Sequence, residues 1–304
     1  MPELPTKPVA LWDSLYMFLS AVRRHFCAEK HYERIILDPD SGIGPSSAMA
    51  RRNFLMRLAY DGTDFLGWQR LRGPAHGAAP GAGRSVQAVV ESCLARVCGA
   101  GVEVVGAGRT DAGVHAEGQG ASFHAFTAHG CDALRDAANA LFPPDLSCVS
   151  CAEVDTRFHA RLHATSKVYR YRLLASEVPD PFLRRYSLRV AEKLDLAAMS
   201  AAAAALVGEK DFRAVSNAKG DDTVRRVDEV RVEAEGRIID LVFVGPGFIY
   251  NQVRVMAALL LEAGKGAIAP ERVPAILAGR DRSAAPGALG PFGLCLVDVR
   301  YDRV

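Results

Sequence analysis

Hydrophobic residues along residues 53–154 follow strand and helix periods in turn. Strict alternation predicts a strand over residues 53–62 that ends in a turn at Asp61-Gly62. Apolar residues three or four positions apart predict a helix over residues 85–99, with Ser85 as its N-cap and Gly99 as its stop. The other elements predicted here are strands over 102–108, 118–126 and 148–154, and a helix over 131–142.

Residues 161–304 repeat this mixture of strands and helices. The alternation in "KVYRYRLL" predicts a strand over residues 167–174, and Glu235-Gly236 divides residues 227–245 into two strands. Helical spacing predicts helices over 195–208, with Asp195 as N-cap, and over 248–264. A last strand is predicted over residues 294–302.

Two halves that each combine strands with one or two helices predict an α+β fold. We expect two pseudo-duplicated α/β subdomains that share one mainly antiparallel sheet. The expected division places an N-terminal extension in residues 1–50, a first subdomain in 51–160 and a second in 161–304. The extension is predicted to be an added helix or partly disordered, since its later part is rich in turn residues.

Composition narrows the class of protein. The 304 residues are 49% hydrophobic and 24% charged, as in a globular protein with a substantial core. Seven cysteines in so long a chain indicate free thiols in a reducing compartment, and no apolar run reaches the length of a membrane helix. We therefore expect no membrane association and a cytoplasmic location, or an organelle if residues 1–50 are a targeting extension. The net charge of +2 does not by itself indicate a nucleic-acid partner.

The most distinctive stretch is "GAGRTDAGVHAEGQ", residues 106–119, which follows a predicted strand. It lacks the third glycine of a dinucleotide-binding turn, because Asp111 occupies that position, and the chain has no phosphate loop. Arg109 and Asp111 share a face if the chain is extended, so that the guanidinium keeps the carboxylate ionised. Asp111 is a candidate nucleophile, although an aspartate in such a turn often only bonds its own backbone.

A zinc-dependent nucleobase deaminase is an alternative. His115 and Glu117 precede the pair Cys148 and Cys151, in an order that such enzymes use. Against it, Cys148 and Cys151 lie on a predicted strand, where their sulfurs would face opposite ways. His159 and His163 would form a metal pair only on a helix, and no third ligand is near them in sequence. We therefore predict no metal.

Several segments together resemble the TruA-type tRNA pseudouridine synthases. "GRTDAGVHAEGQ" resembles their signature, and the other matching segments follow in the family's order over residues 53–301. They are "YDGTDFLGWQR", "RSVQAVVESCL", "ALFPPDLSCVSC", "FHARLHATSKVYRYRL", "GEKDFRAVSN", "TVRRVDEVRV", "GFIYNQVR" and "FGLCLVDVRYD". Residues 1–50 have no counterpart there, and the loop 73–84 is enlarged.

The resemblance implies ferredoxin-like subdomains with a catalytic cleft between them. It places Asp111 on the family's nucleophile, Arg109 on the preceding arginine, and Arg254 on the basic residue that pairs with the nucleophile. Tyr169 falls on the residue that stacks against the target base. His159, Arg161 and Arg170 flank this tyrosine and are expected to bind substrate.

The implied reaction isomerises uridine to pseudouridine in the anticodon stem-loop of tRNA, at uridines 38–40. It needs no cofactor, because nothing is oxidised and no group is donated. The implied working unit is a homodimer that binds tRNA. A non-catalytic RNA-binding relative of these enzymes is a further alternative, which Asp111→Asn would distinguish.

Overall fold

The computed structural model describes residues 50–70 and 84–302, which belong to one compact unit, Ala50–Val304. The predicted N-terminal extension, apart from Ala50, and the enlarged loop, apart from Arg84, lie outside the described residues. Among the residues described, no helix is both long enough and apolar enough to cross a membrane.

The described part alternates strands and helices, as expected from the hydrophobic pattern. The strands are β1 (Arg51–Tyr60), β2 (Val104–Gly106), β3 (His115–Phe126), β4 (Leu146–Val154), β5 (Ala164–Ala175), β6 (Leu188–Val190), β7 (Gly208–Asp211), β8 (Val224–Val227), β9 (Glu229–Glu235), β10 (Ile238–Gly245) and β11 (Leu294–Tyr301). The helices are α2 (Val86–Cys98), α3 (Cys131–Leu141), α4 (Leu196–Leu206), α5 (Gln252–Gly264) and α6 (Val273–Gly279).

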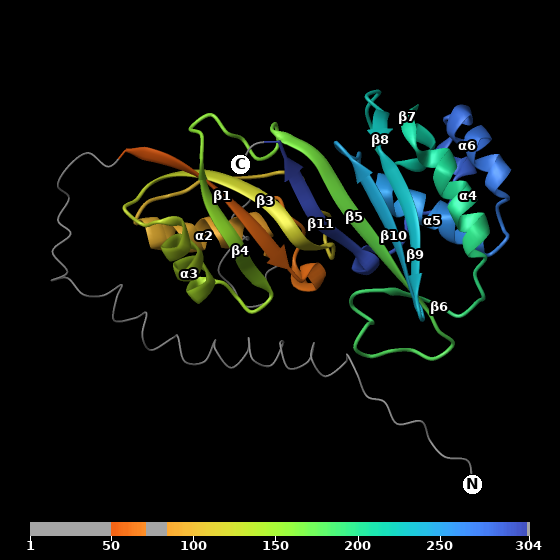
Figure 1. The fold of residues 1–304 in the computed structure, drawn as a ribbon, viewed down its shortest axis with the longest axis horizontal. Coiled ribbons are helices and arrows are strands. Elements are labelled where there is room, and N and C mark those ends of the chain that lie inside the picture. Colours follow the sequence, from red (N-terminus) through yellow and green to blue (C-terminus); the bar gives the residue numbers. More distant parts are fainter. Residues whose placement is uncertain (1–49, 71–83, 303–304) are drawn as a thin grey trace, which may run out of the picture. The chain divides into compact units, whose positions relative to one another are not determined.

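One mainly antiparallel sheet runs through both halves of the described chain, with the strand order β4-β1-β3-β11-β5-β10-β9 (Figure 1). β11 joins the halves, since it pairs in parallel with the start of β3 and antiparallel with β5. Helices α2 and α3 pack beside β2 and β4, while α4 and α5 pack beside β9 and β5. The mixed α/β composition and the mainly antiparallel sheet confirm the predicted fold class.

Local capping explains where two of the helices begin. The Ser85 hydroxyl accepts a hydrogen bond from the Ala88 amide, and the Asp195 carboxylate accepts one from the Ala198 amide at 3.0 Å. Gly99, at φ 68°, ends α2 in the left-handed region that glycine tolerates best. These three residues have the roles predicted for them.

Helix α5 starts later than predicted, at Gln252 in place of residue 248. Asn251 has φ 61°, so that residues 246–251 form a turn before the helix. The Gln252 side chain accepts a hydrogen bond from the Ile249 amide at 3.0 Å and closes this turn. Eleven of the thirteen residues of α5 are buried, as in a helix that runs through the core. Its first turn is therefore held rigidly.

Strand β4 contains an irregularity that the alternation of its sequence does not predict. Cys148 pairs with Leu58 and Ser150 with the neighbouring Arg57, so the register against β1 shifts at Val149. The extra residue restores Cys148 and Cys151 to the same face of the sheet. The prediction that their sulfurs face opposite ways is therefore wrong.

Candidate active site

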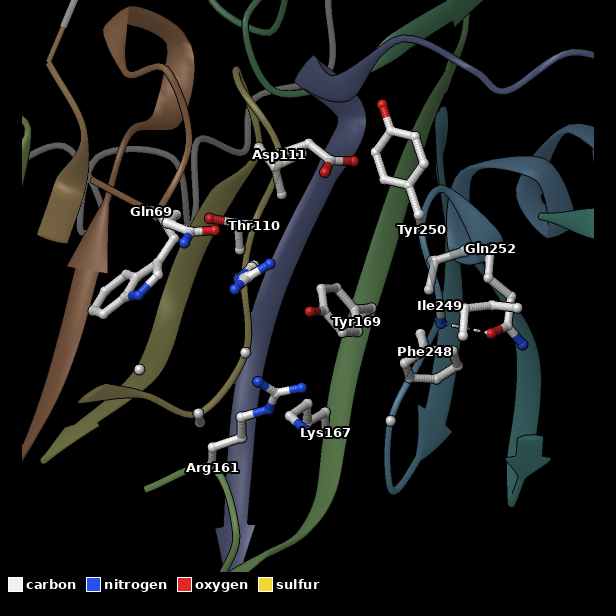
Figure 2. A pocket seen from close by; sticks show the side chains of 18 of the residues that line it. Gln69, Thr110, Asp111, Arg161, Lys167, Tyr169, Phe248, Ile249, Tyr250 and Gln252 are labelled. Carbon is white, nitrogen blue, oxygen red and sulfur yellow. Dashed lines mark hydrogen bonds between the residues drawn. The ribbon is translucent and has the colours of Figure 1, made fainter. Parts of the chain in front are cut away.

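A cleft of about 780 Å³ opens between the strand–loop segment of residues 103–114, strand β5 and the turn before α5 (Figure 2). Residues from all three segments line it. They include Arg109, Thr110 and Asp111 from the loop, Lys167 and Tyr169 from β5, and Phe248, Tyr250, Gln252 and Arg254 from the region that begins α5. Segments distant in sequence thus supply polar groups to one concave surface, as in many ligand sites.

The loop that carries Asp111 is fixed by contacts with the strands below it. The Gln119 amide donates to the carbonyl oxygen of Gly108 at 2.8 Å. The hydroxyls of Thr110 and Tyr60 lie 2.8 Å apart, and the Trp68 amide donates to the carbonyl oxygen of Thr110 at 3.0 Å. On the other side of Asp111, the Gly113 amide donates to the carbonyl oxygen of Phe65 at 3.3 Å. The backbone is therefore anchored on both sides of Asp111, which limits the positions that its carboxylate can take before a ligand arrives.

Glycine at position 67 makes this anchoring possible. Gly67 has φ 90°, and a Cβ atom there would lie 2.6 Å from the carbonyl oxygen of Thr110. Any other residue would combine a strained backbone with a steric clash. The close approach of residues 67 and 110 therefore depends on glycine.

The Arg254 guanidinium forms an ion pair with the Asp111 carboxylate, with 3.5 Å between Nη1 and Oδ2. Two further bonds orient the arginine: Nε donates to the carbonyl oxygen of Leu289 at 2.6 Å, and Nη1 donates to the Asn251 side chain at 3.0 Å. Burial raises the pKa of the Asp111 carboxyl above its usual range, and the charge of Arg254 opposes that rise. Arg254 is therefore the cation that favours the ionised form of Asp111.

The spacing of Arg109 and Asp111 predicted this electrostatic role for Arg109, and that prediction is wrong. Arg109 also lines the cleft, but its side chain is exposed and the charge that acts on Asp111 comes from Arg254. Residues 109–111 lie in a loop outside any strand, so the alternation of side chains along an extended strand does not apply to them.

Tyr169 forms an aromatic wall of the cleft near Asp111. Its ring packs edge-on against Phe248, with 5.5 Å between the ring centroids and 89° between the planes. The residue is 8% exposed, and burial raises the pKa of its hydroxyl, which stays protonated at neutral pH. A rigid aromatic surface in a cleft suits a flat ligand that can stack.

Similarity to known proteins decides the family. A family model described as tRNA pseudouridine synthase matches residues 202–302. The chain is 40% identical over 255 residues to tRNA pseudouridine synthase A of Citrifermentans bemidjiense, and this aligned region covers 83% of this chain and 98% of that protein. It is 40% identical over 246 residues to tRNA pseudouridine synthase A of Moorella thermoacetica, and this aligned region covers 80% of this chain and 97% of that protein. The chain belongs to the TruA-type tRNA pseudouridine synthases.

The enzymes of this family are isomerases that act on tRNA. The fold of this tRNA pseudouridine synthase brings some of the predicted site residues together and separates others. Asp111, Arg109, Arg254, Tyr169 and Arg161 all line the cleft. His159 instead stabilises a turn, because its Nδ1 accepts hydrogen bonds from the amides of Arg161 and Leu162, each at 3.2 Å.

Arg170 does not reach the cleft. Successive residues of a strand point to opposite faces, so Arg170 lies on the other side of β5 from Tyr169. There it donates to Glu117 at 2.6 Å and lies 3.8 Å from Asp240. The structure therefore supports a role for Arg170 in the sheet and gives none in the cleft.

The structure does not assemble the residues of the zinc-deaminase alternative. The His115 Nδ1 accepts from the Gly62 amide at 3.1 Å, and its Nε2 lies 2.9 Å from the carbonyl oxygen of Arg185. Burial raises the pKa of the Cys148 thiol to about 12, which opposes the thiolate that zinc would need. In residues 50–70 and 84–302, no three histidine, cysteine or acidic side chains are grouped as a metal site.

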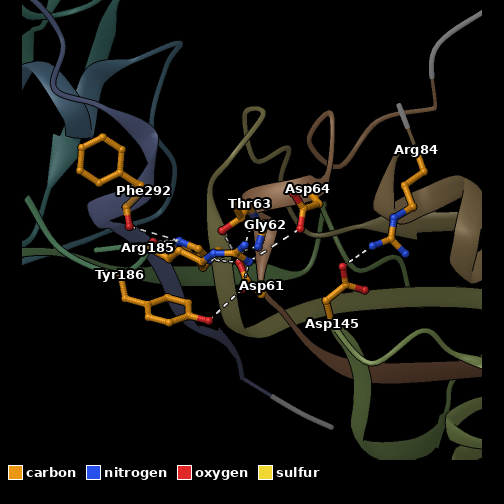
Figure 3. Close-up of polar contacts among 10 residues, drawn as sticks. Asp61, Gly62, Thr63, Asp64, Arg84, Asp145, Arg185, Tyr186 and Phe292 are labelled. Atoms are coloured by element: carbon orange, nitrogen blue, oxygen red, sulfur yellow. Dashed lines mark hydrogen bonds and ion pairs between the residues drawn. The ribbon is translucent and has the colours of Figure 1, made fainter. Parts of the chain in front are cut away.

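His115, through Gly62 and Arg185, belongs instead to a group of contacts that links the two halves of the described chain. Figure 3 shows other members of this group, among them Asp61, Arg185 and Tyr186. The Tyr186 hydroxyl donates to Asp61 at 2.8 Å, and Arg185 lies 3.8 Å from Asp64. Residues 185 and 186 precede β6 in the second half, whereas Asp61 and Asp64 follow β1 in the first. These contacts therefore link the first and second halves of the described chain outside the cleft.

Sequence reasoning missed Lys167 and Phe248, which line the cleft next to Tyr169. The alternation of "KVYRY" carried a signal for Lys167, since residues 167 and 169 must share one face of a strand. Phe248 gave no such signal, because its segment was predicted to be helical and is a turn.

Proposed function

We propose that this chain isomerises uridine to pseudouridine in the anticodon stem-loop of tRNA, at uridines 38–40, with Asp111 as the nucleophile. The observation that carries the proposal is the meeting of Asp111, its partner Arg254 and the Tyr169 ring in one cleft. Each comes from a different segment of the chain, so that only the tertiary structure brings them to one concave surface.

Each of the three side chains has a separate role in the proposed reaction. A uridine must leave its stack to be reached, at a cost of a few kcal/mol. Stacking on Tyr169 offsets about 1–3 kcal/mol of that cost. Asp111 then attacks the nucleotide as an ionised carboxylate, and Arg254 holds its charge and its orientation. The bond between N1 of the base and C1′ of the ribose breaks, the base turns, and C5 bonds to C1′. C5 loses its proton, N1 takes one up, and Asp111 is released as a free carboxylate.

Arg109 is proposed to contact the RNA from the rim of the cleft. Its exposed side chain lies two residues from the nucleophile and has no ion-pair partner among the residues described. A free guanidinium there can bind a phosphate or occupy the space that the extruded base leaves.

We further propose that the reaction proceeds without a cofactor or metal, that the working unit is a homodimer and that it acts in the cytoplasm. Isomerisation leaves the oxidation state and the atoms of the substrate unchanged, so no group need be supplied. The described cysteines are all free, which supports a reducing compartment. Light scattering of the purified chain with and without tRNA tests the dimer.

The proposal is tested by mapping pseudouridine in unmodified tRNA after incubation with purified enzyme. Asp111→Asn removes the nucleophile and should lower turnover at least about a thousandfold, as loss of a catalytic group commonly does. Glu117→Gln is the matched control, since Glu117 lies in the same signature but pairs with Arg170 on the opposite face of the sheet. It should leave turnover nearly unchanged.

The outcomes separate the alternatives. Pseudouridine formation that persists in Asp111→Asn would remove Asp111 from the mechanism. Release of ammonia, lost in Glu117→Gln, would indicate a deaminase. Binding of tRNA without any product, in the unaltered enzyme, would indicate a non-catalytic relative. Product outside the anticodon stem-loop would contradict the proposed target.

A further inference from the structure

Lys167 places a positive charge inside the cleft with little to compensate it. The residue is 9% exposed, and its Nζ donates to the carbonyl oxygen of Pro246 at 3.0 Å. An ammonium group has three hydrogen-bond donors and carries a full charge, which a single neutral carbonyl group satisfies only in part. Burial, together with the nearby charge of Arg161, lowers the pKa of Lys167.

Lys167 and its neighbour Arg161 differ from most of the cations of the sheet in their ion pairing. Among the described residues, neither Lys167 nor the side chain of Arg161 forms an ion pair. The contrast with Arg172 is informative, because its guanidinium binds both oxygens of Asp240, at 2.8 and 2.7 Å. A buried cation without a counter-ion costs free energy, so its presence in a cleft points to a ligand that supplies the negative charge.

The position of Lys167 matches a nucleotide whose base lies on Tyr169. Residues i and i+2 of a strand are about 6.6 Å apart on one face, a separation comparable to that between a base and a backbone phosphate. Figure 2 shows Arg161 and Lys167 beside each other on the Tyr169 side of the cleft. The cleft here is lined by backbone at Gly108, where a Cβ atom would lie 3.4 Å from Lys167 Cε and 4.0 Å from the Tyr169 hydroxyl.

We propose that Lys167 and Arg161 bind a phosphate group of the RNA backbone immediately next to the target uridine. This proposal rests on the proposed function and adds a subsite to it. Lys167 supplies a fixed point charge at the inner wall, and the exposed Arg161 closes on the phosphate from the rim with its planar fork. The turn capped by His159 positions Arg161 for this contact.

The first test measures tRNA binding and turnover over a salt series for Lys167→Met, which keeps the length of the side chain and removes its charge. We expect the KM to rise about tenfold and the slope of log Kd against log salt to fall by about one, as for one lost phosphate contact. Lys210→Met is the matched control, since Lys210 also donates to a backbone carbonyl group, that of Val207, but lies on β7 outside the cleft. It should change neither quantity. Lys167→Arg keeps the charge and should retain the salt slope.

The second test removes the charge from the RNA instead. An anticodon stem-loop with a neutral methylphosphonate linkage on the 5′ or the 3′ side of the target uridine is compared with the unmodified RNA. One of the two linkages should lower kcat/KM about tenfold for the unaltered enzyme and leave that of Lys167→Met unchanged. Such coupling between enzyme and RNA variants reports a direct contact.

The outcomes keep this proposal separate from the proposed function. If neither linkage couples to Lys167, or if Lys167→Met retains the original salt slope, the phosphate subsite is wrong even where Asp111→Asn remains inactive. A fall in kcat with unchanged KM and unchanged slope would also overturn it and would give Lys167 a part in the chemistry. Thermal unfolding of each variant verifies that it is folded.

Discussion

The positively charged side chains on the two faces of strand β5 differ in whether they are paired with a carboxylate. On one face Arg172 binds both oxygens of Asp240, and Arg170 binds Glu117 at 2.6 Å. On the other face Lys167 is nearly as buried as Tyr169, and no carboxylate among the described residues pairs with it. Neighbouring positions of one strand therefore hold compensated and uncompensated cations.

This difference separates charges that hold the protein together from charges that await a partner. Ion pairs that span β3, β5 and β10 link strands of the sheet, and they are complete without a ligand. On the cleft face Lys167 has no such partner among the described residues, and the ion pair between Arg254 and Asp111 is long at 3.5 Å. Substitutions on the two faces should therefore affect different measurements.

Of the substitutions that test this difference between the two faces, Arg254→Gln in the cleft should lower kcat/KM most. We expect kcat/KM to fall by about 10²–10³, the size seen when one preorganised charged or polar partner is removed from an active site. The pKa of Asp111, already raised by burial, should rise further without the opposing charge. The acid limb of the pH–rate profile should therefore move to higher pH. An unmoved limb would show that Arg254 does not control the ionisation of Asp111.

Tyr169→Leu should have the next largest effect, also on the cleft face. Leucine fills part of the space but cannot stack, so the loss of about 1–3 kcal/mol of base–aromatic stacking should lower kcat/KM by about 5- to 150-fold. Steady-state kinetics with an anticodon stem-loop measures it. Activity equal to that of the unaltered enzyme would exclude Tyr169 as the stacking residue.

On the opposite face, Asp240→Asn should affect stability instead of turnover. It leaves the Arg172 guanidinium without its counter-ion, and the two side chains are 27% and 17% exposed. We expect the free energy of unfolding to fall by about 2 kcal/mol, less than for a fully buried pair because solvent reaches both groups. Urea unfolding measures this loss. A large fall in kcat/KM of the folded variant would contradict the separation of the two faces.

Lys167→Met should change the free energy of unfolding least of these variants, and it should raise that free energy, whereas Asp240→Asn lowers it. The pKa of Lys167 is below its ordinary value of 10.5 in the folded protein, so near pH 10 the unfolded chain holds the proton more tightly. Stability of the unaltered protein therefore rises with pH in that range. Lys167→Met lacks this contribution, so it should be more stable at neutral pH by an amount that shrinks as pH approaches 10.5. A pH-independent difference in urea unfolding would contradict this.

Local sequence signals predicted much of the fold. Ser85 and Asp195 cap helices as expected because a capping side chain acts on amides only three residues away. The register shift at Val149 was not predictable, because it depends on how β4 pairs with β1, about ninety residues earlier in the chain. The left-handed Asn251, which delays α5, depends likewise on its surroundings.

The site was predicted less evenly. Spacing alone placed Arg109 beside Asp111, and the structure gives that role to Arg254, which is 143 positions away. Only resemblance to known enzymes connected Asp111, Tyr169 and Arg254, since the contact between them is created by tertiary structure. The predicted role of Arg170 in substrate binding conflicts with the alternation of its strand, which places Arg170 on the face opposite Tyr169.

The parallel pairing of β11 with β3 also has a consequence for how the protein is made. β11 is the last of the described strands to leave the ribosome, and it lies between the strands of the first half and those of the second. Until it is synthesised, β5 and the start of β3 are sheet edges with unpaired backbone groups, which favour aggregation of the nascent chain. A ribosome that stops before Leu294 therefore releases a polypeptide that contains Asp111, Tyr169 and Arg254 but has no cleft in which they can meet.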